Sequence, residues 1–561
     1  MKYTSFLCAF LGVITATSFG TQAAVLPNGS TELQNIPAPT FPAKKIPQLT
    51  TPATSQAEVL VDANEQKIAI QSFKIVGNTA FTEPQLITSL ALLAEQHQWS
   101  LSELRQLAQK LTSYYRERGY FLAQAYLPQQ DVIDGQVTIA VLEGRLGNIQ
   151  VQNESTVQDS VATANAREMA VGQVIDIKSL ERQVLLLNDL PGVEAKSLIV
   201  PGQEVGTADL RLILAPTPRI GGVATLDNLG GPYTGINRLG VNLVLNEPLG
   251  LGDMLSAYGL TAGPGLSFTR LGYQTQYQAF TLGLAKTALL YQLGDAFASL
   301  GASGSMDITS LSATYAVVKT RDRTLNLSWA LDDKSADDKV ASTVYKSIKR
   351  VKAYTYSMHT DFNDSTLAEA QNKFILSYTE GRVDLQSPDV LVGDAATAQS
   401  NGSYGKLALN FNRIEAVTAT TQLKFRLNAQ WASKNLDATE KMVLGGNSGV
   451  RAYPAGEATG DEGYIVNIET QTLMPWWSDS LPGHLQLGGF IDAGSVKLSR
   501  TPWAVGDNAR TLGSTGLLLH WFRSEDALDI KATLAFKLGS EVAKSAPDSD
   551  WRAWLTVTKY F

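Results

Sequence analysis

Residues 423–431 read LKFRLNAQW and alternate between apolar and polar side chains at every position. Successive side chains of a β-strand point to opposite faces, so this stretch predicts a strand with one apolar face and one polar face. The same alternation recurs in residues 325–331 (LNLSWAL) and 530–538 (IKATLAFKL). From about residue 219 to the C-terminus no helical pattern competes with it, so this part of the chain is predicted to be all β.

The apolar faces of these strands must be shielded from water, either by a protein core or by lipid. A soluble barrel of this size would be unusual, whereas ~10-residue alternating strands with polar connections are typical of a transmembrane barrel. Residues 332–339 (DDKSADDK) are predicted to be one such connection. At about 21 residues for each strand and its connection, the region holds roughly 16 strands. The predicted fold class is therefore mainly β, with a transmembrane barrel over residues 218–561.

The first residues indicate export. Lys2 precedes an uncharged apolar run over residues 6–14, and Thr21 and Ala23 place small residues before a cleavage site. This pattern predicts a secretory signal peptide over residues 1–23, in preference to a cytosolic hydrophobic helix or a lipid-anchored Cys8. Residues 24–66 contain six prolines and are predicted to be an extended linker, with room for a longer helix only near residues 56–66.

The composition excludes several function classes. The chain has 561 residues with Lys+Arg 46 and Asp+Glu 53, a net charge of -7, so no basic excess exists to bind nucleic acid. The single cysteine, Cys8, falls in the predicted signal peptide. Disulfides, thiolate zinc sites and thiol catalysis are therefore not expected. With only four well-separated histidines and no P-loop, we expect no metal, no cofactor, no small-molecule substrate and no enzyme activity.

Two repeated units precede the barrel. Residues 67–146 predict the order β-α-α-β-β, and residues 147–217 repeat it, which indicates two tandem small α+β domains. In the first unit, Ser100 and Glu103 form a capping box at the start of the second helix. Asp134-Gly135 predicts a hairpin turn between the last two strands, Phe121–Leu127 and Val137–Leu142.

Several short motifs stand along the chain in a definite order. They are residues 73–78 (FKIVGN), 115–120 (YRERGY), 127–130 (LPQQ) and 141–147 (VLEGRLG), then 187–193 (LNDLPGV), 227–230 (DNLG) with 250–253 (GLGD), 450–454 (VRAYP) with 456–463 (GEATGDEG), and 490–494 (FIDAG). Together they resemble the two-partner secretion transporters, the haemolysin secretion/activation protein family. The resemblance covers nearly the whole mature chain and implies a 16-stranded outer-membrane barrel behind two POTRA domains, which lie in the periplasm.

The resemblance also implies site residues. The first POTRA motif maps to Gly77, Asn78, Gly119, Tyr120, Pro128, Glu143 and Gly144, and the loop and wall of the pore map to Val450, Arg451, Tyr453, Phe490, Asp492 and Gly494. In the family the long loop folds back into the lumen, where its arginine meets the aspartate of the wall; a solvated loop charge is the alternative for Arg451. Phe561 resembles the terminal barrel signal, although Lys559 on the same face departs from that pattern.

For the function, the resemblance implies export of a large haemolysin- or adhesin-like protein, the client, through the barrel. The client's N-terminal secretion domain would add a strand to a POTRA sheet edge, with outer-membrane lipid and the barrel-assembly machinery as further partners. POTRA domains that act only as spacers are the alternative. An insertase of the same superfamily, a passive porin and a hydrolase using His484 or His520 remain as other functions, although no Ser/His/Asp order stands out.

Overall fold

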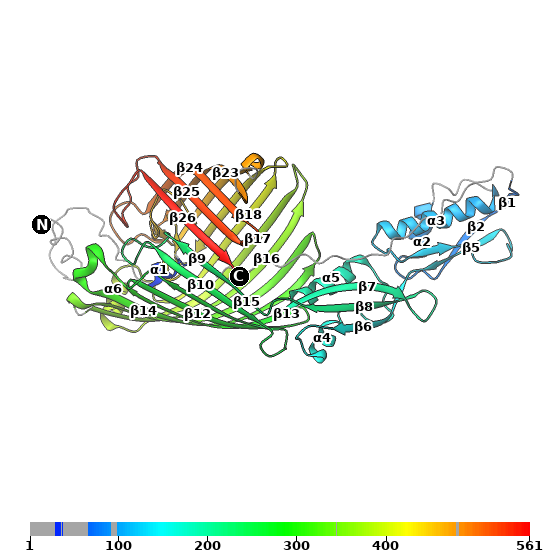
Figure 1. Ribbon diagram of the computed structural model, residues 1–561, viewed down its shortest axis with the longest axis horizontal. Coiled ribbons are helices and arrows are strands. Elements are labelled where there is room, and N and C mark those ends of the chain that lie inside the picture. Colours follow the sequence, from blue (N-terminus) through cyan, green and yellow to red (C-terminus); the bar gives the residue numbers. More distant parts are fainter. Residues whose placement is uncertain (1–28, 35, 38–64, 91–97, 344, 478–481) are drawn as a thin grey trace.

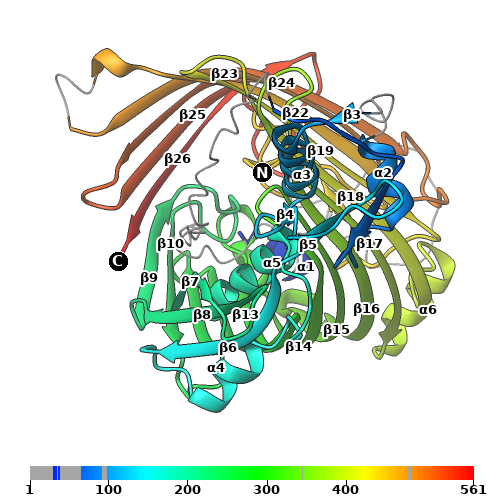
Figure 2. The ribbon, with the colours of Figure 1, turned by 90° about the vertical axis from the view of Figure 1, so that its right-hand side faces the viewer.

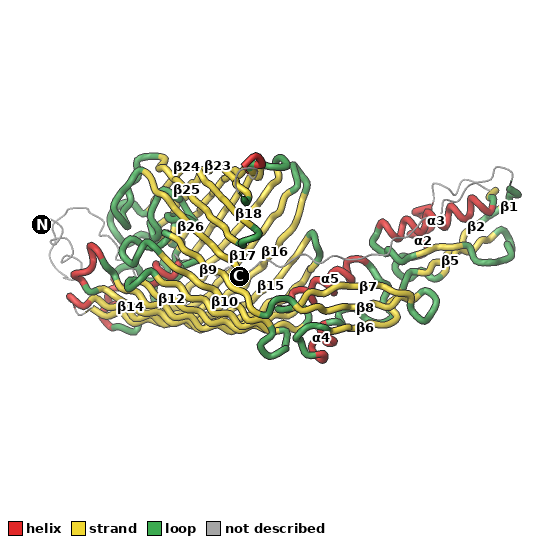
Figure 3. The backbone as a smooth tube through the Cα atoms, viewed as in Figure 1, coloured by secondary structure: helices red, strands yellow, loops and turns green. Residues whose placement is uncertain are grey.

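The computed structural model describes residues 29–34, 36–37, 65–90, 98–343, 345–477 and 482–561. The signal peptide predicted for residues 1–23 lies outside these ranges. The described chain forms two small domains in line with one large closed barrel (Figure 1). Strands dominate the barrel, and the longer helices belong to the two small domains (Figure 3). The predicted fold class is confirmed. Among the described residues, no helix has both the length and the apolar character needed to cross a bilayer.

The two small domains share one topology. The first contains β1 (Ile68–Ala69), β2 (Ser72–Val76), α2 (Glu83–Leu90), β3 (Gln98–Trp99), α3 (Leu101–Glu117), β4 (Gln124–Tyr126) and β5 (Gln136–Leu142). The second contains β6 (Arg145–Asn153), α4 (Asp159–Asn165), α5 (Ile177–Asp189), β7 (Val193–Pro201) and β8 (Thr207–Pro216). Their sheets run β2-β5-β4 and β6-β8-β7, so the last strand lies in the middle of each. The predicted repeat of element order is confirmed.

Two local features predicted for the first domain, the capping box and the hairpin turn, are present in the structure. The Ser100 side chain accepts from the Glu103 backbone, and the Glu103 side chain accepts from the Ser100 backbone, so the predicted capping box is present. Asp134 and Gly135 both have positive φ, 52° and 67°, as a tight hairpin turn requires. The strand predicted over 121–127 is shorter, because residues 118–122 still turn away from the end of α3.

The barrel closes in the order β10 to β19, β22 to β26 and β9, which gives the predicted number of strands. Its strands are β9 (Ile220–Asp227), β10 (Arg238–Asn246), β11 (Asp253–Thr261), β12 (Leu266–Tyr277), β13 (Phe280–Gln292), β14 (Ala302–Lys319), β15 (Arg323–Val340), β16 (Tyr345–Asp364), β17 (Ala370–Leu385), β18 (Gly402–Ala416), β19 (Thr421–Ala432), β22 (Glu462–Leu473), β23 (His484–Lys497), β24 (Ala509–Arg523), β25 (Leu528–Leu538) and β26 (Trp551–Tyr560). Outside the barrel wall lie β20 (Met442–Val443), β21 (Thr459–Gly460) and the helix α6 (Pro388–Ala396).

The prediction of a connection at residues 332–339 is wrong. These residues continue β15, which pairs with β16 all the way from Arg323↔Phe362 to Val340↔Tyr345. The outward positions change from Leu327, Trp329 and Leu331 to Asp333, Ser335 and Asp337 along the same strand. A strand that extends past lipid has water on its outer face and needs no apolar side chains there. The polar stretch therefore marks the end of the lipid-facing band and not the end of the strand.

The linker prediction also needs correction. Residues Gly29–Gln34 form a short helix, α1, which contacts β13 and β14 of the barrel. The Thr234 hydroxyl donates to Glu32 at 2.9 Å, and Glu32 is 4% exposed. The helix forms in the proline-free interval between Pro27 and Pro37, which was too short to be recognised by its periodicity. The longer helix considered near residues 56–66 lies almost wholly outside the described residues.

The first and last strands close the barrel over a short seam. β9 and β26 pair from Val223↔Tyr560 to Asp227↔Thr556. Beyond this ladder the side chain of Asn228 continues the pairing: its Oδ1 accepts from the Leu555 backbone at 2.7 Å, and its Nδ2 donates to the Ala553 carbonyl at 3.0 Å. At the other end, Gly222 and Phe561 exchange backbone bonds of 2.7 and 3.0 Å. The C-terminal residue therefore takes part in barrel closure.

The seam gives a first prediction. Asn228→Ala removes two hydrogen bonds from the shortest strand contact of the barrel and should lower the temperature at which the folded band disappears in a heat-modifiability gel by about 2–4 °C. The control is Asn363→Ala on β16, whose side chain makes no hydrogen bond to another described residue. An equal shift in both variants would contradict a special role for Asn228.

Candidate functional site

The connection between β19 and β22, residues 433–461, folds into the barrel instead of extending away from it. Its apolar side chains are fully buried: Leu444, Val450, Ala452 and Tyr453 are 0% exposed. They form a common core with wall residues Ile465, Phe490, Val496 and Leu512. We call this segment the lumen loop, and its residues 449–453 the loop tip.

Arg451 fixes the loop tip to the barrel wall. Its Nη2 lies 2.9 Å from Asp492 Oδ1 and its Nε donates to Asp492 Oδ2 at 3.0 Å, while Nη1 lies 2.7 Å from Glu469 Oε2. The guanidinium stacks 3.5 Å above the ring of Phe490. A planar fork facing a carboxylate and an aromatic face is the geometry that arginine, and not lysine, provides.

Asp492 is a fully satisfied buried carboxylate. It is 0% exposed and also accepts from Ser514 Oγ at 2.7 Å and from Asn467 Nδ2 at 2.8 Å. The indole N–H of Trp554 donates to the Arg451 carbonyl at 2.8 Å. Strands β22, β23, β24 and β26 therefore all contribute to holding one loop residue.

The other predicted loop and wall residues lie in the same place. The Tyr453 hydroxyl donates to the Glu541 carbonyl at 3.0 Å. Gly494 leaves room for the loop, because a Cβ there would lie 2.3 Å from Leu444 Cδ1. Val450 and Phe490 belong to the shared core. The structure thus brings together Val450, Arg451, Tyr453, Phe490, Asp492 and Gly494, which lie on the loop and on one strand.

The residues of the first small-domain motif form the interior of that domain. Glu143, 3% exposed, accepts from the Thr79 and Ala80 backbones at 2.6 and 2.8 Å and from the Tyr115 hydroxyl at 3.0 Å. Gly77 has φ +83°, and a Cβ there would meet the Val141 carbonyl oxygen at 2.3 Å.

The remaining motif residues have similar local roles. Asn78 Nδ2 donates to the Phe81 carbonyl at 3.0 Å, and Tyr120 packs edge-on against Phe81 at 5.4 Å. The Pro128 carbonyl accepts from Gln130 Nε2 at 3.4 Å, and Gly119 and Gly144 both have positive φ. These contacts indicate that the motif builds the domain and does not form a surface site.

Glu143 gives a second prediction. Burial would raise the pKa of Glu143, but the hydrogen bonds from Thr79, Ala80 and Tyr115 together lower it. A lowered folded-state pKa means that the stabilisation is present above the unfolded pKa of about 4.3 and is lost as the pH falls through the folded value. Glu143→Ala should destabilise the first domain by about 3 kcal/mol at neutral pH. Hydrogen exchange of residues 72–90 in the full-length protein measures this loss.

The controls for Glu143 separate charge from packing. Glu117→Gln at the exposed end of α3 should leave exchange unchanged at every pH. Glu143→Gln should remove most of the acid sensitivity, because it has no carboxylate to protonate. Acid sensitivity that persists in Glu143→Gln would show that another group is responsible.

Sequence reasoning missed several residues of the site. Glu469, Asn467 and Ser514 face the lumen, and the only signal for them was a polar residue at an inward position. Trp554 also faces the lumen, but an aromatic residue in a barrel strand gives no signal of an inward position. Glu457, 1% exposed, accepts from the Lys544 and Ser545 backbones at 2.9 and 2.8 Å and thereby joins the lumen loop to the β25–β26 connection.

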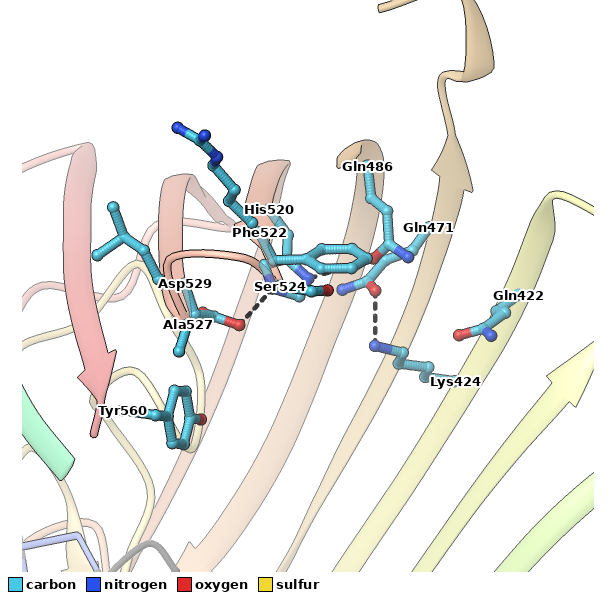
Figure 4. A pocket seen from close by; sticks show the side chains of 12 residues that line it. Gln422, Lys424, Gln471, Gln486, His520, Phe522, Ser524, Ala527, Asp529 and Tyr560 are labelled. Carbon is cyan, nitrogen blue, oxygen red and sulfur yellow. Dashed lines mark hydrogen bonds and ion pairs between the residues drawn. The ribbon is translucent and has the colours of Figure 1, made fainter. Parts of the chain in front are cut away.

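A cavity of about 410 Å³ lies in the lumen at the end of the barrel near the small domains (Figure 4). There His520 Nε2 lies 2.7 Å from Asp529 Oδ2, its Nδ1 lies 3.2 Å from Gln486 Oε1, and Lys424 donates to Gln471 at 2.6 Å. Both ring nitrogens of His520 therefore have partners, a carboxylate and an amide oxygen, and neither partner is a hydroxyl that the imidazole could activate. Ser524 also lines this cavity, but no described contact joins it to His520.

The second small domain rests on the turns at this end of the barrel. Lys319 Nζ lies 2.6 Å from Asp189, and Gln276 Nε2 donates to the Leu186 carbonyl at 2.8 Å. The Gln158 backbone donates to the Gly250 carbonyl at 2.9 Å. Viewed along the long axis, this domain covers the side of the barrel mouth formed by the strands from β10 to β14 (Figure 2). The domain is thus attached to the turns that follow β10, β12 and β14.

A closed 16-stranded barrel with an inward-folded loop and two small α+β domains at one end is a POTRA-bearing outer-membrane barrel. Residues 206–513 match the family model described as haemolysin secretion/activation protein ShlB/FhaC/HecB, and residues 68–144 match the POTRA domain, ShlB-type. The chain belongs to the haemolysin secretion/activation protein family. It is an outer-membrane transporter of a two-partner secretion system, which exports an exoprotein, and its POTRA domains lie in the periplasm.

Related proteins agree with this assignment. The chain is 26% identical to the heme/hemopexin transporter protein HuxB of Haemophilus influenzae (strain 86-028NP) over 469 residues, which cover 82% of this chain and 81% of that protein. It is 24% identical to the outer membrane transporter CdiB of Dickeya dadantii, over 71% of each chain. The solved structure of CdiB from Escherichia coli is similar in fold, with a TM-score of 0.72 and 20% identity over 91% of this chain and 94% of that one.

Proposed function

We propose that the POTRA domains capture the unfolded client by adding its N-terminal secretion domain as an extra strand, and that the client then crosses the outer membrane through the barrel lumen. The observation that supports capture is a free sheet edge: among the described residues, β7 pairs only with β8. The outer edge of β6 is partly covered, because Arg145 bridges to Val174 and the Leu146 backbone donates to the Gln173 carbonyl at 2.9 Å. β7 is a nine-residue edge strand whose other side is open. Main-chain hydrogen bonds to such an edge require no fixed client sequence.

The lumen loop is proposed to be the movable element of this pathway. Its tip is held by side chains, mainly through Arg451 and Asp492, and not by a continuous strand ladder. Side-chain contacts of this kind can be exchanged without unfolding the wall, whereas the barrel strands are held by their full backbone ladders. Arg451 and Asp492 are therefore assigned the role of holding the loop in its resting position.

We propose that the protein is a transporter without enzyme activity of its own. The family consists of transporters, and His520, the histidine that lines the cavity in Figure 4, is paired with Asp529 and Gln486. The bias for outward movement would come from folding of the client outside the cell. Insertion of the transporter itself would use outer-membrane lipid and the barrel-assembly machinery, with Phe561 as the terminal signal.

The proposed division of the chain follows the same scheme. Residues 1–23 are the signal peptide, 24–66 the N-terminal segment, 67–146 and 147–217 the two POTRA domains, and 218–561 the barrel. The N-terminal segment is proposed to reach into the lumen, since α1 contacts β13 and β14.

The experiment that tests the function identifies a large exoprotein encoded next to the gene and expresses it with and without this protein. Client in the medium should appear only when both are expressed, although the client is made inside the cell in both strains. Accumulation of unassembled outer-membrane proteins on deletion would instead indicate an insertase. A large steady conductance without any client dependence would indicate a passive porin.

A further inference from the structure

A second group of charges holds the lumen loop at another part of the wall. Three lysines on three strands, Lys334 of β15, Lys349 of β16 and Lys406 of β18, converge on two loop carboxylates, Asp437 and Glu440. Lys349 Nζ lies 2.9 Å from Asp437 Oδ2. Lys334 and Lys406 lie 2.6 and 2.8 Å from the two oxygens of Glu440. We call these three residues the lysine site.

The lysine site is buried from water by its own ligands. The side chains of Lys334, Lys349 and Lys406 are 13%, 6% and 18% exposed, and those of Asp437 and Glu440 are 8% and 3% exposed. Three ammonium groups held this close repel one another unless anions neutralise them. If the loop leaves, the lysines stay on the rigid barrel wall and lose both loop carboxylates at once. Asp332 and Asp338 of β15 still act on Lys334 and Lys349 through their charges, so part of the compensation remains. The positions of Asp437 and Glu440 then require replacement anions or water.

The loop presents its two carboxylates as a preformed pair. The Thr439 backbone and hydroxyl donate to Asp437 Oδ1 at 3.0 and 2.8 Å, which fixes the turn that separates the two acids by three residues. The Glu440 carbonyl accepts from Gln430 Nε2 and from Lys406 Nζ, both at 3.1 Å. Residues 437–440 of the loop are therefore bound by the lysines in the way that a short acidic peptide would be bound by a cationic site.

The same segment touches the N-terminal helix. Gln34 Nε2 donates to the Ala438 and Lys441 carbonyls at 2.9 and 2.8 Å, on either side of Glu440. The loop segment that occupies the lysine site is therefore also a docking surface for α1. Departure of α1 removes two hydrogen bonds from this segment and weakens its hold on the lysines.

We propose that Lys334, Lys349 and Lys406 form a carboxylate-binding site on the pore wall, that Asp437 and Glu440 occupy it as built-in ligands, and that an acidic segment of the exported chain replaces them during transport. The last step rests on the proposed function. The ligand class follows from the donors: three flexible ammonium groups at the wall match carboxylates spaced along a peptide.

The test uses the full-length protein in planar lipid bilayers. The probe is the peptide NLDATEKM, identical to residues 435–442, and the control peptide carries Asn and Gln in place of its Asp and Glu. In the Asp437→Asn, Glu440→Gln variant the lysines have lost their built-in ligands, so the acidic peptide added from the extracellular side should lower the mean current about threefold relative to the neutral peptide. Wild-type protein should respond less, because its site is occupied.

Removal of the lysines is the matched control. Lys334→Gln, Lys349→Gln and Lys406→Gln in the same background should abolish the difference between the two peptides. Equal block by both peptides, or block that persists without the lysines, overturns the proposal. If the double variant gives no folded band, Asp437→Asn and Glu440→Gln are compared singly, and a difference between peptides that is no larger than in wild type overturns it as well.

The readout needs no client. A protein that secretes normally but shows no lysine-dependent block overturns this inference and leaves the proposed function in place. If a protein that exports nothing still shows lysine-dependent block, the inference of a carboxylate-binding site stands and the proposed function is contradicted.

Discussion

Replacement of Arg451 by alanine is expected to reduce export of the client about tenfold or more, while the barrel still inserts and folds. The change leaves Asp492, which is 0% exposed, without its cation, and an uncompensated buried charge costs about 3–5 kcal/mol. The loop tip then no longer has a defined resting position. The barrel strands do not depend on Arg451, since their ladders are backbone bonds. Client in the medium and heat-modifiability of the barrel measure the two effects separately.

Two variants sharpen this test. Arg451→Lys keeps the charge but cannot form the fork to Asp492 or stack as well on Phe490, so we expect export between wild type and Arg451→Ala. Arg500→Ala removes an arginine whose side chain is 44% exposed, and export should be unchanged. Normal export by Arg451→Ala would refute the role of the pair in holding the loop.

Deletion of the first POTRA domain, residues 68–144, is expected to reduce export about twentyfold or more without loss of the folded barrel. The barrel should tolerate the deletion because the second domain, and not the first, makes the contacts of Lys319 with Asp189 and of Gln276 with Leu186. Removal of the first domain also takes away the edge strands β2 and β4 and leaves the client only the sheet of the second domain.

The spacer alternative predicts a different outcome. If residues 68–144 are replaced by an unrelated folded domain of similar length, a spacer role requires that export returns. A capture role requires that export stays low although the barrel is in the membrane. Recovery of export by the unrelated domain would contradict capture by the first domain.

Alternation of side chains was sufficient to predict the barrel, because lipid outside and water inside impose a period of two on every strand within the bilayer. It could not predict where the long strands end. Residues 332–339 of β15 lie beyond the lipid-facing band, where the physical constraint that creates the pattern no longer acts. The helix α1 was missed for a related reason: six residues are too few for helical periodicity to be read.

The site was predictable only where a motif marks it. Arg451 and Asp492 stand in recognisable short sequences, and the structure places them in contact. Lys349 and Asp437 are 88 residues apart, and neither lies in a recognisable motif. Their contact depends on the path of the lumen loop across the barrel. This path is a property of the tertiary structure and produces no local sequence pattern.

The second POTRA domain is attached to the turns that follow β10, β12 and β14, so the periplasmic entrance is asymmetric. Among the described residues, its contacts spare the turns at 417–420 and 524–527, beside the cavity of Figure 4. A polypeptide that approaches from the periplasm therefore has one open sector, and its first neighbours there are Lys424, His520 and Asp529. On the proposed pathway, the position of the second domain would therefore limit the directions from which the client reaches the lumen.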